Sequence, residues 1–421
     1  MKMVSFDDAL QDLGHNMSVY VQGIAMTPTA LLEALSERCR CLSGVRLYHI
    51  HLEGPTPHLD AGLAGKLHDI SWFVGRNTRD AVNRGAADHL PLFLSDIPRF
   101  IEQQMALDYA LIQVSPPDKY GYVSLGTSVE AALSAIKRAR TVVAQVNPQV
   151  PRVRGAAEVP ASAITWGVWH EAPLHTMPTP PRDAVTSQIA AYVAELVPDR
   201  ATLQLGIGAI PNAVLEALRN HRDLGIHSEM ISDGIQPLME SGVITGRYKA
   251  VDVGLVVATF AFGSARFYGF LNENPAISLR SVDYTNDTAV IRRHPRMISI
   301  NSAIEVDVTG QVAAESVGTR VVSGVGGQMD FVRGASLAPD GLSIIALPSR
   351  TRDGKPRIVP TLHPGAAVTT TRNHVQYVVT EYGSVNLHGL TLRERVRALI
   401  GLAHPADRDA LERYAKDAWF L

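Results

Sequence analysis

One carboxylate stands in an unexpected place in the stretch LGIHSEMISDG, residues 224–234. Glu229 lies between apolar neighbours, where a chain would be entering the core of a protein. An ionised carboxylate is costly to bury without partners. We therefore expect Glu229 either to lie at a strand end facing solvent or to take part in chemistry. His227 would share its face in a strand, where it either tunes the carboxylate or packs in the core.

Two glycine-rich turns are suited to placing backbone N–H groups against negative charge. LGIGAIP, residues 205–211, reads as a strand-to-helix turn, at which N–H groups and a helix N-terminus face an anion. It is not the dinucleotide fingerprint, because Pro211 replaces the third glycine, and the chain has no Walker A pattern. SGVGGQMDFVRGAS, residues 323–336, lets the backbone approach a ligand closely. Taken alone, this second segment reads as a tight loop.

Two other sets of residues could do chemistry on residue type alone. Glu305 alternates with Asp307 in INSAIEVDVTG, which favours a structural role in a strand. The string YHIHLEGPTPH places His49 and His51 on one face of a predicted strand, with His58 beyond, and such a set could hold a metal. No Asp or Cys completes it at ligand spacing, so we predict no metal site.

Composition describes an ordinary globular protein. The chain has 421 residues, of which 46% are hydrophobic and 19% charged, with a net charge of −2 that argues against a nucleic-acid partner. The N-terminus lacks the apolar region of a signal peptide, and no apolar run is long enough to span a membrane. Cys39 and Cys41 are the only cysteines, which fits a reducing compartment. We expect a cytoplasmic protein with small-molecule partners.

An internal repeat predicts the architecture. VQGIAMTPTALLEAL, residues 21–35, and QLGIGAIPNAVLEAL, residues 204–218, align without gaps, so that Pro28 falls on Pro211. Each copy reads as a strand, a glycine turn and a helix. Short apolar runs alternate with helical patterns, as in parallel sheets, and a proline-rich stretch separates the halves. We predict an α/β fold of two similar domains with mainly parallel sheets, residues 1–178 and 179–421.

Several long motifs resemble one protein family. LGIGAIPNAVLEAL, LGIHSEMISDG, GVGGQMDFVRGAS and VTEYGSVNLHGLTLRERVRALIGLAHP are together similar to the acetyl-CoA hydrolase/transferase family, and the likeness runs over nearly the whole chain. It is greatest to the class I CoA-transferases that use 4-hydroxybutyrate, butyrate or acetate. The resemblance implies two tandem α/β domains with the active site in the cleft between them. It further implies a homo-oligomer such as a homodimer, no metal, and CoA or acyl-CoA as substrate rather than as a bound cofactor.

The resemblance also assigns roles to individual residues. Glu229 would be the nucleophile that forms a glutamyl-CoA thioester in a ping-pong reaction. Asn286 and Gly326 or Gly327 would stabilise oxyanions, although the family usually has His-Pro after this Asn, where the chain has Asp287 and Thr288. Glu381, in TEYG, and His227 would position the substrate. The residues expected to bind CoA are Gln204, Gly206, Ile207, Gly208, Ala209, Ile210, Gly324 and Gly327.

Two alternatives stay open beside an acyl-CoA:carboxylate CoA-transferase. An acyl-CoA hydrolase on the same scaffold would let water intercept the activated intermediate, and the sequence does not reveal water access. A catalytically inactive CoA-binding regulatory protein is disfavoured by the intact Glu229 and glycine loop. We therefore predict a transferase that acts on butyryl-, 4-hydroxybutyryl- or acetyl-CoA with acetate or a similar acid.

Overall fold

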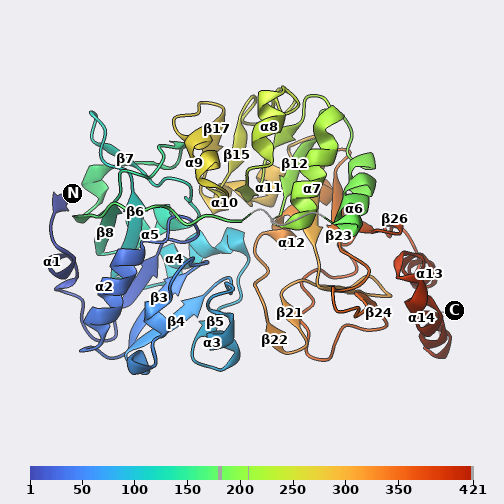
Figure 1. Ribbon diagram of the computed structural model, residues 1–421, viewed down its shortest axis with the longest axis horizontal. Coiled ribbons are helices and arrows are strands. Elements are labelled where there is room, and N and C mark those ends of the chain that lie inside the picture. Colours follow the sequence, from blue (N-terminus) through green and yellow to red (C-terminus); the bar gives the residue numbers. More distant parts are fainter. Residues whose placement is uncertain (179–182, 207, 419–421) are drawn as a thin grey trace. The chain divides into compact units, whose positions relative to one another are not determined.

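The chain forms two compact units in a computed structural model that describes residues 1–178, 183–206 and 208–418. Unit 1 comprises Met1–Pro178 with two later segments, Val257–Thr285 and Val322–Gly326. Unit 2 comprises Thr179–Val256, Asn286–Val321 and Gly327–Leu421. Both are built from a mainly parallel sheet with helices packed against it, as the sequence predicts (Figure 1). The expected boundary after residue 178 assigns these two segments to the second domain, whereas in the structure they belong to unit 1.

An eight-stranded, wholly parallel sheet organises unit 1. Its central strands are buried along their whole length, which explains their continuous apolar sequence. In spatial order the strands are β1 (Lys2–Met3), β11 (Trp166–Trp169), β8 (Thr141–Val146), β6 (Tyr109–Val114), β2 (Ser18–Val21), β3 (Val45–His49), β4 (Leu67–Ser71) and β5 (Asp88–His89).

The helices of unit 1 bury the apolar faces of this sheet. In α2, Leu31, Leu32 and Leu35 are fully buried and share one core cluster with residues of β2, β3 and β4. The helices are α1 (Phe6–Leu10), α2 (Thr29–Cys39), α3 (Arg79–Asn83), α4 (Ile97–Gln104) and α5 (Ala132–Arg138). A 3₁₀ turn, η1 (Pro57–Leu59), packs against both α2 and β4. Smaller strands are β7 (Tyr122–Ser124), antiparallel to β10 (Glu158–Pro160).

The first returning segment completes part of unit 1. Its strand β17 (Ile277–Leu279) pairs in parallel with β9 (Arg154–Gly155). Its helices are α9 (Ala265–Leu271) and α10 (Val282–Thr285), and its other strands are β15 (Val256–Ala258) and β16 (Phe260–Ala261). The hydroxyl of Tyr268 in α9 donates to the carbonyl of His175 at 2.7 Å, and Phe267 is fully buried. This segment is therefore an integral part of the packing of unit 1.

Unit 2 has a six-stranded sheet that is parallel except for its last pair. In spatial order the strands are β13 (Gly225–Ile226), β12 (Thr202–Leu205), β18 (Met297–Ser302), β23 (Leu342–Ala346), β25 (Tyr377–Thr380) and β26 (Gly383–Asn386). Its helices are α6 (Ala184–Glu195), α7 (Ala209–Ala217), α8 (Ile235–Glu240), α11 (Thr288–Ile291), α12 (Gln328–Leu337), α13 (Leu392–Leu402) and α14 (Pro405–Asp417).

Short strands complete unit 2. A small sheet contains β20 (Val312–Ala313), β19 (Glu305–Asp307) and β24 (Ile358–Val359), and a hairpin contains β21 (Ser316–Val317) and β22 (Arg320–Val321). Within the described ranges, no helix of either unit combines the length and the apolar character needed to cross a bilayer.

The two copies of the repeat occupy matching places in their sheets. The strand β2 lies between β3 and β6, and β12 lies between β13 and β18, so each is flanked by the next strand and a later one. The helices begin at different points, however. Pro28 precedes α2 as its N-cap residue, whereas Pro211 lies inside the first turn of α7. The second copy therefore begins its helix closer to the strand, at the LGIGAIP turn.

Candidate active site

Glu229 lies in the turn between β13 and β14 (Met230–Ile231), beside the edge strand of the unit 2 sheet. The N–H of His227 donates to the carbonyl of Leu203 at 3.0 Å. The hydroxyl of Ser228 lies 3.3 Å from both the backbone N and the carbonyl O of Leu205. These bonds fasten the HSEM segment to the end of β12. Glu229 thus follows a buried strand but is only partly buried itself.

Two N–H donors approach the Glu229 carboxylate within unit 2. The Nδ2 atom of Asn286 lies 3.4 Å from Oε2, and the backbone N–H of Gly327 also donates to the carboxylate. The same Nδ2 atom lies 3.2 Å from Oδ2 of Asp330. One amide group is therefore shared between two carboxylates, and Asp330 orients the side chain of Asn286 towards Glu229.

These surroundings raise the pKa of Glu229 to about 7. Burial is the largest cause, and the negative charge of Asp330 adds to it, whereas the hydrogen bonds from Asn286 and Gly327 lower the pKa. About half of the carboxyl groups are then ionised near neutral pH. A carboxylate with few water molecules around it is also a stronger nucleophile than a solvated one.

The position next to Glu229 accepts only glycine. A Cβ atom at Gly327 would overlap both Oε2 of Glu229 and Nδ2 of Asn286. Gly327 is the N-cap residue of α12, and Asp330 lies in the first turn of that helix. Gly326, which the sequence places beside it, has a φ of 55°, and its carbonyl accepts from the N–H of Leu94 at 3.2 Å within unit 1. The donor that reaches Glu229 inside unit 2 is therefore Gly327.

The departure from the family pattern after Asn286 has a local structural role. Asn286 is fully buried, and Asp287 is the N-cap residue of α11. The Oδ1 atom of Asp287 accepts from the N–H of Ala289 at 2.7 Å, which satisfies one of the free donors at the helix start. Asp287 and Thr288 thus begin a helix directly after Asn286 and leave its amide directed at the two carboxylates.

The histidine of HSEM packs in the interior. His227 is fully buried, with its ring centroid 4.7 Å from that of His294 and 6.3 Å from that of Phe331. Burial lowers the pKa of His294 to about 2, and the nearby His227 and Lys249 act in the same direction. His294 is therefore neutral, and the pair forms a packed layer in unit 2. A substrate-positioning role for His227 stays a prediction.

The LGIGAIP turn leads from β12 into α7. The side-chain amides of Gln204 and Asn301 bond each other reciprocally at 3.3 and 3.0 Å, which holds Gln204 inside the sheet. The N–H of Gly206 donates to the carbonyl of Ile300 at 3.2 Å. Gly208 is the N-cap residue of α7 with a φ of 118°, a conformation that favours glycine. Ile207, also predicted to bind CoA, lies outside the described residues.

A pocket of about 360 Å³ opens at the N-terminus of α7. It lies at the carboxyl ends of β18 and β23, where parallel α/β sheets characteristically bind ligands. Its lining residues are Asp183, Val185, Thr186, Ala209, Ile210, Pro211, Ser302, Ala303, Ala346, Pro348, Arg350, Thr351, Arg352 and Arg357. Two of the residues predicted to bind CoA, Ala209 and Ile210, are therefore pocket residues.

The three arginines give the pocket a positive character. Arg350 forms a two-point ion pair with Asp407 at 2.8 and 2.5 Å. Arg357 donates to the carbonyl of Ala303 at 3.0 Å, and Arg352 is exposed. Guanidinium groups and a helix N-terminus both attract anions, and guanidinium matches phosphate geometry. The pocket is suited to a phosphorylated ligand.

The other predicted positions have structural contacts. The two oxygens of Glu381 accept from the backbone N–H and the hydroxyl of Ser349 at 2.9 and 2.5 Å, so Glu381 holds the turn next to Arg350. In unit 1, a Cβ atom at Gly324 would come within 2.8 Å of the carbonyl of Trp72. Glu305, the alternative nucleophile, accepts from the N–H of His363 at 2.8 Å and also contacts its ring.

Sequence reasoning missed Asp330. The residue stands inside the quoted motif GVGGQMDFVRGAS, three positions after Gly327. The sequence feature that could have indicated it is the helix that begins after the glycines. The side chain of the third residue of a helix points back towards the helix N-terminus, where Gly327 lies. Only the fold brings that first turn next to Asn286.

Comparison with known proteins gives consistent matches. Residues 1–165 match the acetyl-CoA hydrolase/transferase N-terminal domain, and residues 263–415 match the corresponding C-terminal domain. A succinyl-CoA:acetate/propanoyl-CoA:succinate CoA transferase of Fasciola hepatica is 45% identical over 98% of this chain and 87% of that protein. The 4-hydroxybutyrate coenzyme A transferase of Clostridium kluyveri is 44% identical over 97% and 96%. The crystal structure of RipA from Yersinia pestis matches with a TM-score of 0.94 at 34% identity, covering 100% of this chain and 98% of that one.

Proposed function

Because the chain belongs to the acetyl-CoA hydrolase/transferase family, and relatives of 44–45% identity are CoA-transferases, we propose that it transfers CoA between an acyl-CoA and a free carboxylate, with Glu229 as nucleophile. One observation carries the assignment of the residue. The partly buried carboxylate of Glu229 has a raised pKa and accepts hydrogen bonds from Gly327 and Asn286. Such donors stabilise charge that develops on an oxygen during acyl transfer.

The first half of the reaction stores the activated acyl group on the enzyme. An oxygen of Glu229 attacks the thioester carbonyl carbon, the C–S bond breaks, and CoA leaves as a thiolate. The product is a mixed anhydride between the acid and Glu229. The thiolate then attacks the glutamyl carbonyl carbon, which releases the acid as a carboxylate and leaves a glutamyl-CoA thioester. A second carboxylate reverses these steps, so no ATP is consumed.

The contacts of Glu229 fit the second of these attacks. When the thiolate adds to the glutamyl carbon, negative charge develops on a Glu229 oxygen. In the free protein Oε2 already accepts from Asn286 and the carboxylate also accepts from Gly327. Donors already in place need no rearrangement as the charge forms, which lowers the barrier. Asp330 supports this geometry by holding the amide of Asn286 at 3.2 Å.

The pocket at the N-terminus of α7 is our proposed site for the phosphates of CoA. CoA carries a pyrophosphate and a further phosphate, and the pocket is lined by three arginines at a helix N-terminus. The acyl groups that we propose are short, such as acetyl, butyryl or 4-hydroxybutyryl, with acetate or a similar acid as acceptor. The named relatives support this size class, since their substrates are succinate, acetate, propanoyl and 4-hydroxybutyrate groups.

Intact-mass measurement tests the covalent step. The protein is incubated with butyryl-CoA or acetyl-CoA, and one portion is then reduced with borohydride. We expect an adduct with the mass of CoA less water on the wild type and none on Glu229→Ala, with borohydride reduction mapping to position 229. Glu305→Gln is the matched control and keeps the adduct. If Glu229→Ala turns over normally, the assignment of the nucleophile is wrong.

Acetate added to the adduct separates transfer from hydrolysis. A transferase converts the glutamyl-CoA thioester into acetyl-CoA, with little free CoA. A hydrolase releases free CoA at the same rate whether or not acetate is present. An inactive CoA-binding protein binds acyl-CoA but forms no adduct and neither product.

A further inference from the structure

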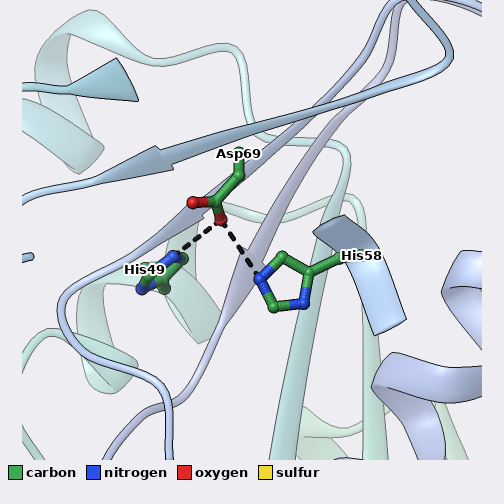
Figure 2. Close-up of side chains that lie close together, drawn as sticks. All are labelled: His49, His58 and Asp69. Carbon is green, nitrogen blue, oxygen red and sulfur yellow. Dashed lines mark hydrogen bonds and ion pairs between the residues drawn. The ribbon is translucent and has the colours of Figure 1, made fainter. Parts of the chain in front are cut away.

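Two histidines and an aspartate meet in the interior of unit 1, and none of the three has a role in the proposed reaction (Figure 2). His49 ends β3, Asp69 lies in β4, and His58 lies in the 3₁₀ turn η1. The register pairs Leu47 with Asp69, so His49 and Asp69 are diagonal neighbours on the same face of the sheet. The turn η1 packs onto β4, and Figure 2 shows the rings of His49 and His58 both approaching the Asp69 carboxylate.

Two of the three residues, His49 and His58, belong to the histidine string that could hold a metal by residue type alone. The same string also contains His51, and it offers no Asp or Cys at ligand spacing, so the sequence predicts no metal site there. The strand β3 ends at His49, and His51 instead contacts the carboxylate of Glu53 at 3.0 Å. The missing acid comes from the next strand of the sheet, a neighbour in space that linear spacing does not reveal.

The cluster is buried but its polar atoms are poorly satisfied. The side chains of all three residues have no exposed surface. The Nε2 atom of His49 lies 2.8 Å from Oδ1 of Asp69, and this is the hydrogen bond within the set. Within the described chain, both ring nitrogens of His58, Nδ1 of His49 and Oδ2 of Asp69 have no hydrogen-bond partner. Buried polar atoms are normally hydrogen-bonded. Four unbonded polar atoms in one cluster therefore indicate a missing ligand.

The surroundings make the missing partner a cation. His49 and Asp69 share their strand faces with Val45, Leu47 and Leu67, all members of the apolar core of unit 1. One carboxylate oxygen and three ring nitrogens, all unbonded and enclosed by apolar side chains, form a donor set of the kind that binds a metal cation.

The distances between the donor atoms fit one metal ion. Oδ1 of Asp69 is 2.8 Å from Nε2 of His49 and 3.6 Å from Nε2 of His58, and one ligand atom from each residue lies within 4.8 Å of the others. Bonds of about 2.0–2.1 Å in a tetrahedral arrangement place two ligand atoms roughly 3.3 Å apart, so only small shifts are required. The separation of 3.6 Å is too long for a hydrogen bond.

We propose that His49, His58 and Asp69 bind a divalent transition-metal ion, Zn²⁺ in the first place. Two imidazoles and one carboxylate form a nitrogen-rich set that suits zinc and disfavours magnesium and calcium. Three protein ligands leave a fourth position for water, as in other three-ligand zinc sites. The ion links β3, β4 and η1. Its role is to fasten η1, which lies in the connection between β3 and β4, to the sheet. The proposal concerns unit 1 alone and does not depend on the proposed function.

Metal content is measured first on protein purified without a metal-affinity tag. We expect one zinc ion per chain in the wild type after extensive dialysis. His58→Gln and Asp69→Asn are expected to lower the zinc content and the affinity for added zinc by roughly tenfold or more. His68→Gln is the matched control, because His68 is the neighbour of Asp69 in β4 but lies on the exposed face, with 44% of its side chain exposed. This control keeps its zinc.

Thermal unfolding of the wild type gives a readout that does not depend on the variants folding. Chelator-treated wild type is expected to melt at a lower temperature and to recover when zinc is added. Cobalt bound in place of zinc is expected to show the visible absorption of a tetrahedral site. A chelator-treated wild type that stays folded, takes up no zinc and melts at the same temperature with and without zinc overturns the proposal, and buried water then fills the site. Zinc lost equally from His68→Gln and His58→Gln overturns it as well, since the ion would then be a surface contaminant.

Discussion

At the residue scale, the environment of Glu229, the proposed nucleophile, opposes its ionisation. Burial and the neighbouring Asp330 raise the pKa of Glu229 to about 7. In the proposed reaction the attacking species is the carboxylate, so part of the enzyme would be in the unreactive acid form at neutral pH. The compensating advantage is that few water molecules solvate the ionised carboxylate, which makes it a stronger nucleophile. The measurable result is that both rate and stability depend on the protonation of one group.

The rate of adduct formation is expected to rise with pH and to level off above about 7. With the pKa of Glu229 at about 7, the rate one pH unit lower is roughly tenfold below the plateau. Stopped-flow measurement of CoA release from acyl-CoA between acid and mildly alkaline pH gives the profile. Asp330→Asn removes a charge that raises the pKa of Glu229, so its midpoint moves to lower pH. A flat profile in the wild type would exclude Glu229 as the titrating nucleophile.

Glu229→Gln is expected to stabilise the protein at alkaline pH while abolishing turnover. The folded-state pKa of about 7 lies above the reference value of 4.5. The associated stability is therefore fully present below the unfolded-state pKa and is lost as pH rises through about 7. Above that pH, the neutral glutamine avoids a cost on the order of 1–3 kcal/mol. Urea unfolding at alkaline pH and near the reference pKa measures the difference.

Glu381→Gln is the control for that measurement. Its carboxylate accepts two hydrogen bonds from Ser349, so replacement is expected to leave stability unchanged or to lower it at both pH values. An equal gain in both variants would show that the effect does not come from desolvation of Glu229.

Gly327→Ala is expected to lower turnover by roughly a hundredfold or more, because its Cβ atom displaces Glu229 and Asn286. Gly401→Ala is the matched control, since no atom lies within 4 Å of the added Cβ in α13, and it keeps full activity. Steady-state kinetics and circular dichroism of both variants separate a catalytic loss from misfolding. Normal kcat in Gly327→Ala would contradict the proposed oxyanion contacts.

At this scale, the structure places three of the residues named from the sequence next to one another. Glu229 and Gly327 lie in long motifs, Asn286 was named from the family resemblance, and the three are in contact. Asp330 and Asp69 were not found. Each acts through a contact between segments that are distant along the chain, and residue type alone does not distinguish such an acid from a solvated one.

At the element scale, the main feature of the proposed CoA site is the turn from β12 into α7. The sequence predicts this strand, turn and helix from the repeat, and the structure confirms the strand and the helix. It does not predict the arginines that complete the pocket, because Arg350, Arg352 and Arg357 follow β23, far away in the chain. Only the parallel order of β12, β18 and β23 places the ends of these strands together.

Arg352→Ala is expected to raise the KM for acyl-CoA severalfold and to leave the KM for the carboxylate acceptor unchanged. Arg352 is an exposed pocket residue, whereas Arg350 and Arg357 also form hydrogen bonds to other parts of the protein. Replacing Arg352 is therefore expected to disturb the structure least. Removing one phosphate contact typically costs about 1–2 kcal/mol. Initial-rate kinetics with both substrates varied gives the two constants.

Arg393→Ala, on the exposed face of α13, removes an equal charge outside the pocket and serves as the control. If both variants raise the KM for acyl-CoA equally, the effect comes from net charge and the pocket does not bind the phosphates. If neither does, CoA binds elsewhere.

At the scale of the whole molecule, unit 1 is not one continuous stretch of chain. The repeat predicts two successive domains, and this prediction describes the two central sheets well. It places the segments 257–285 and 322–326 in the second domain, whereas in the structure they belong to unit 1. Their own sequences carry ordinary helix and strand patterns, and no local signal states which sheet they join. This part of the fold depends on long-range packing alone.

A fragment of residues 1–178 is expected not to unfold cooperatively by itself. It lacks the strand β17 that pairs with β9, and the buried Phe267 and Tyr268 of α9. Loss of these contacts leaves apolar surface exposed, which favours aggregation. Circular dichroism melting and light scattering measure the two effects. Co-expression with residues 179–421 as a separate chain restores a soluble, cooperatively melting protein.

The same discontinuity has a consequence during synthesis on the ribosome. The last segment of unit 1 ends at Gly326, about 150 residues after Pro178. At roughly 5–20 residues per second, unit 1 waits on the order of ten to thirty seconds for its final pieces after most of its sheet has been translated. During that interval β9 has no partner from β17, and the surface that α9 covers is open to other nascent chains. Rare codons between the two halves would lengthen this exposure, so we expect the yield of soluble protein to fall with slower translation of that region.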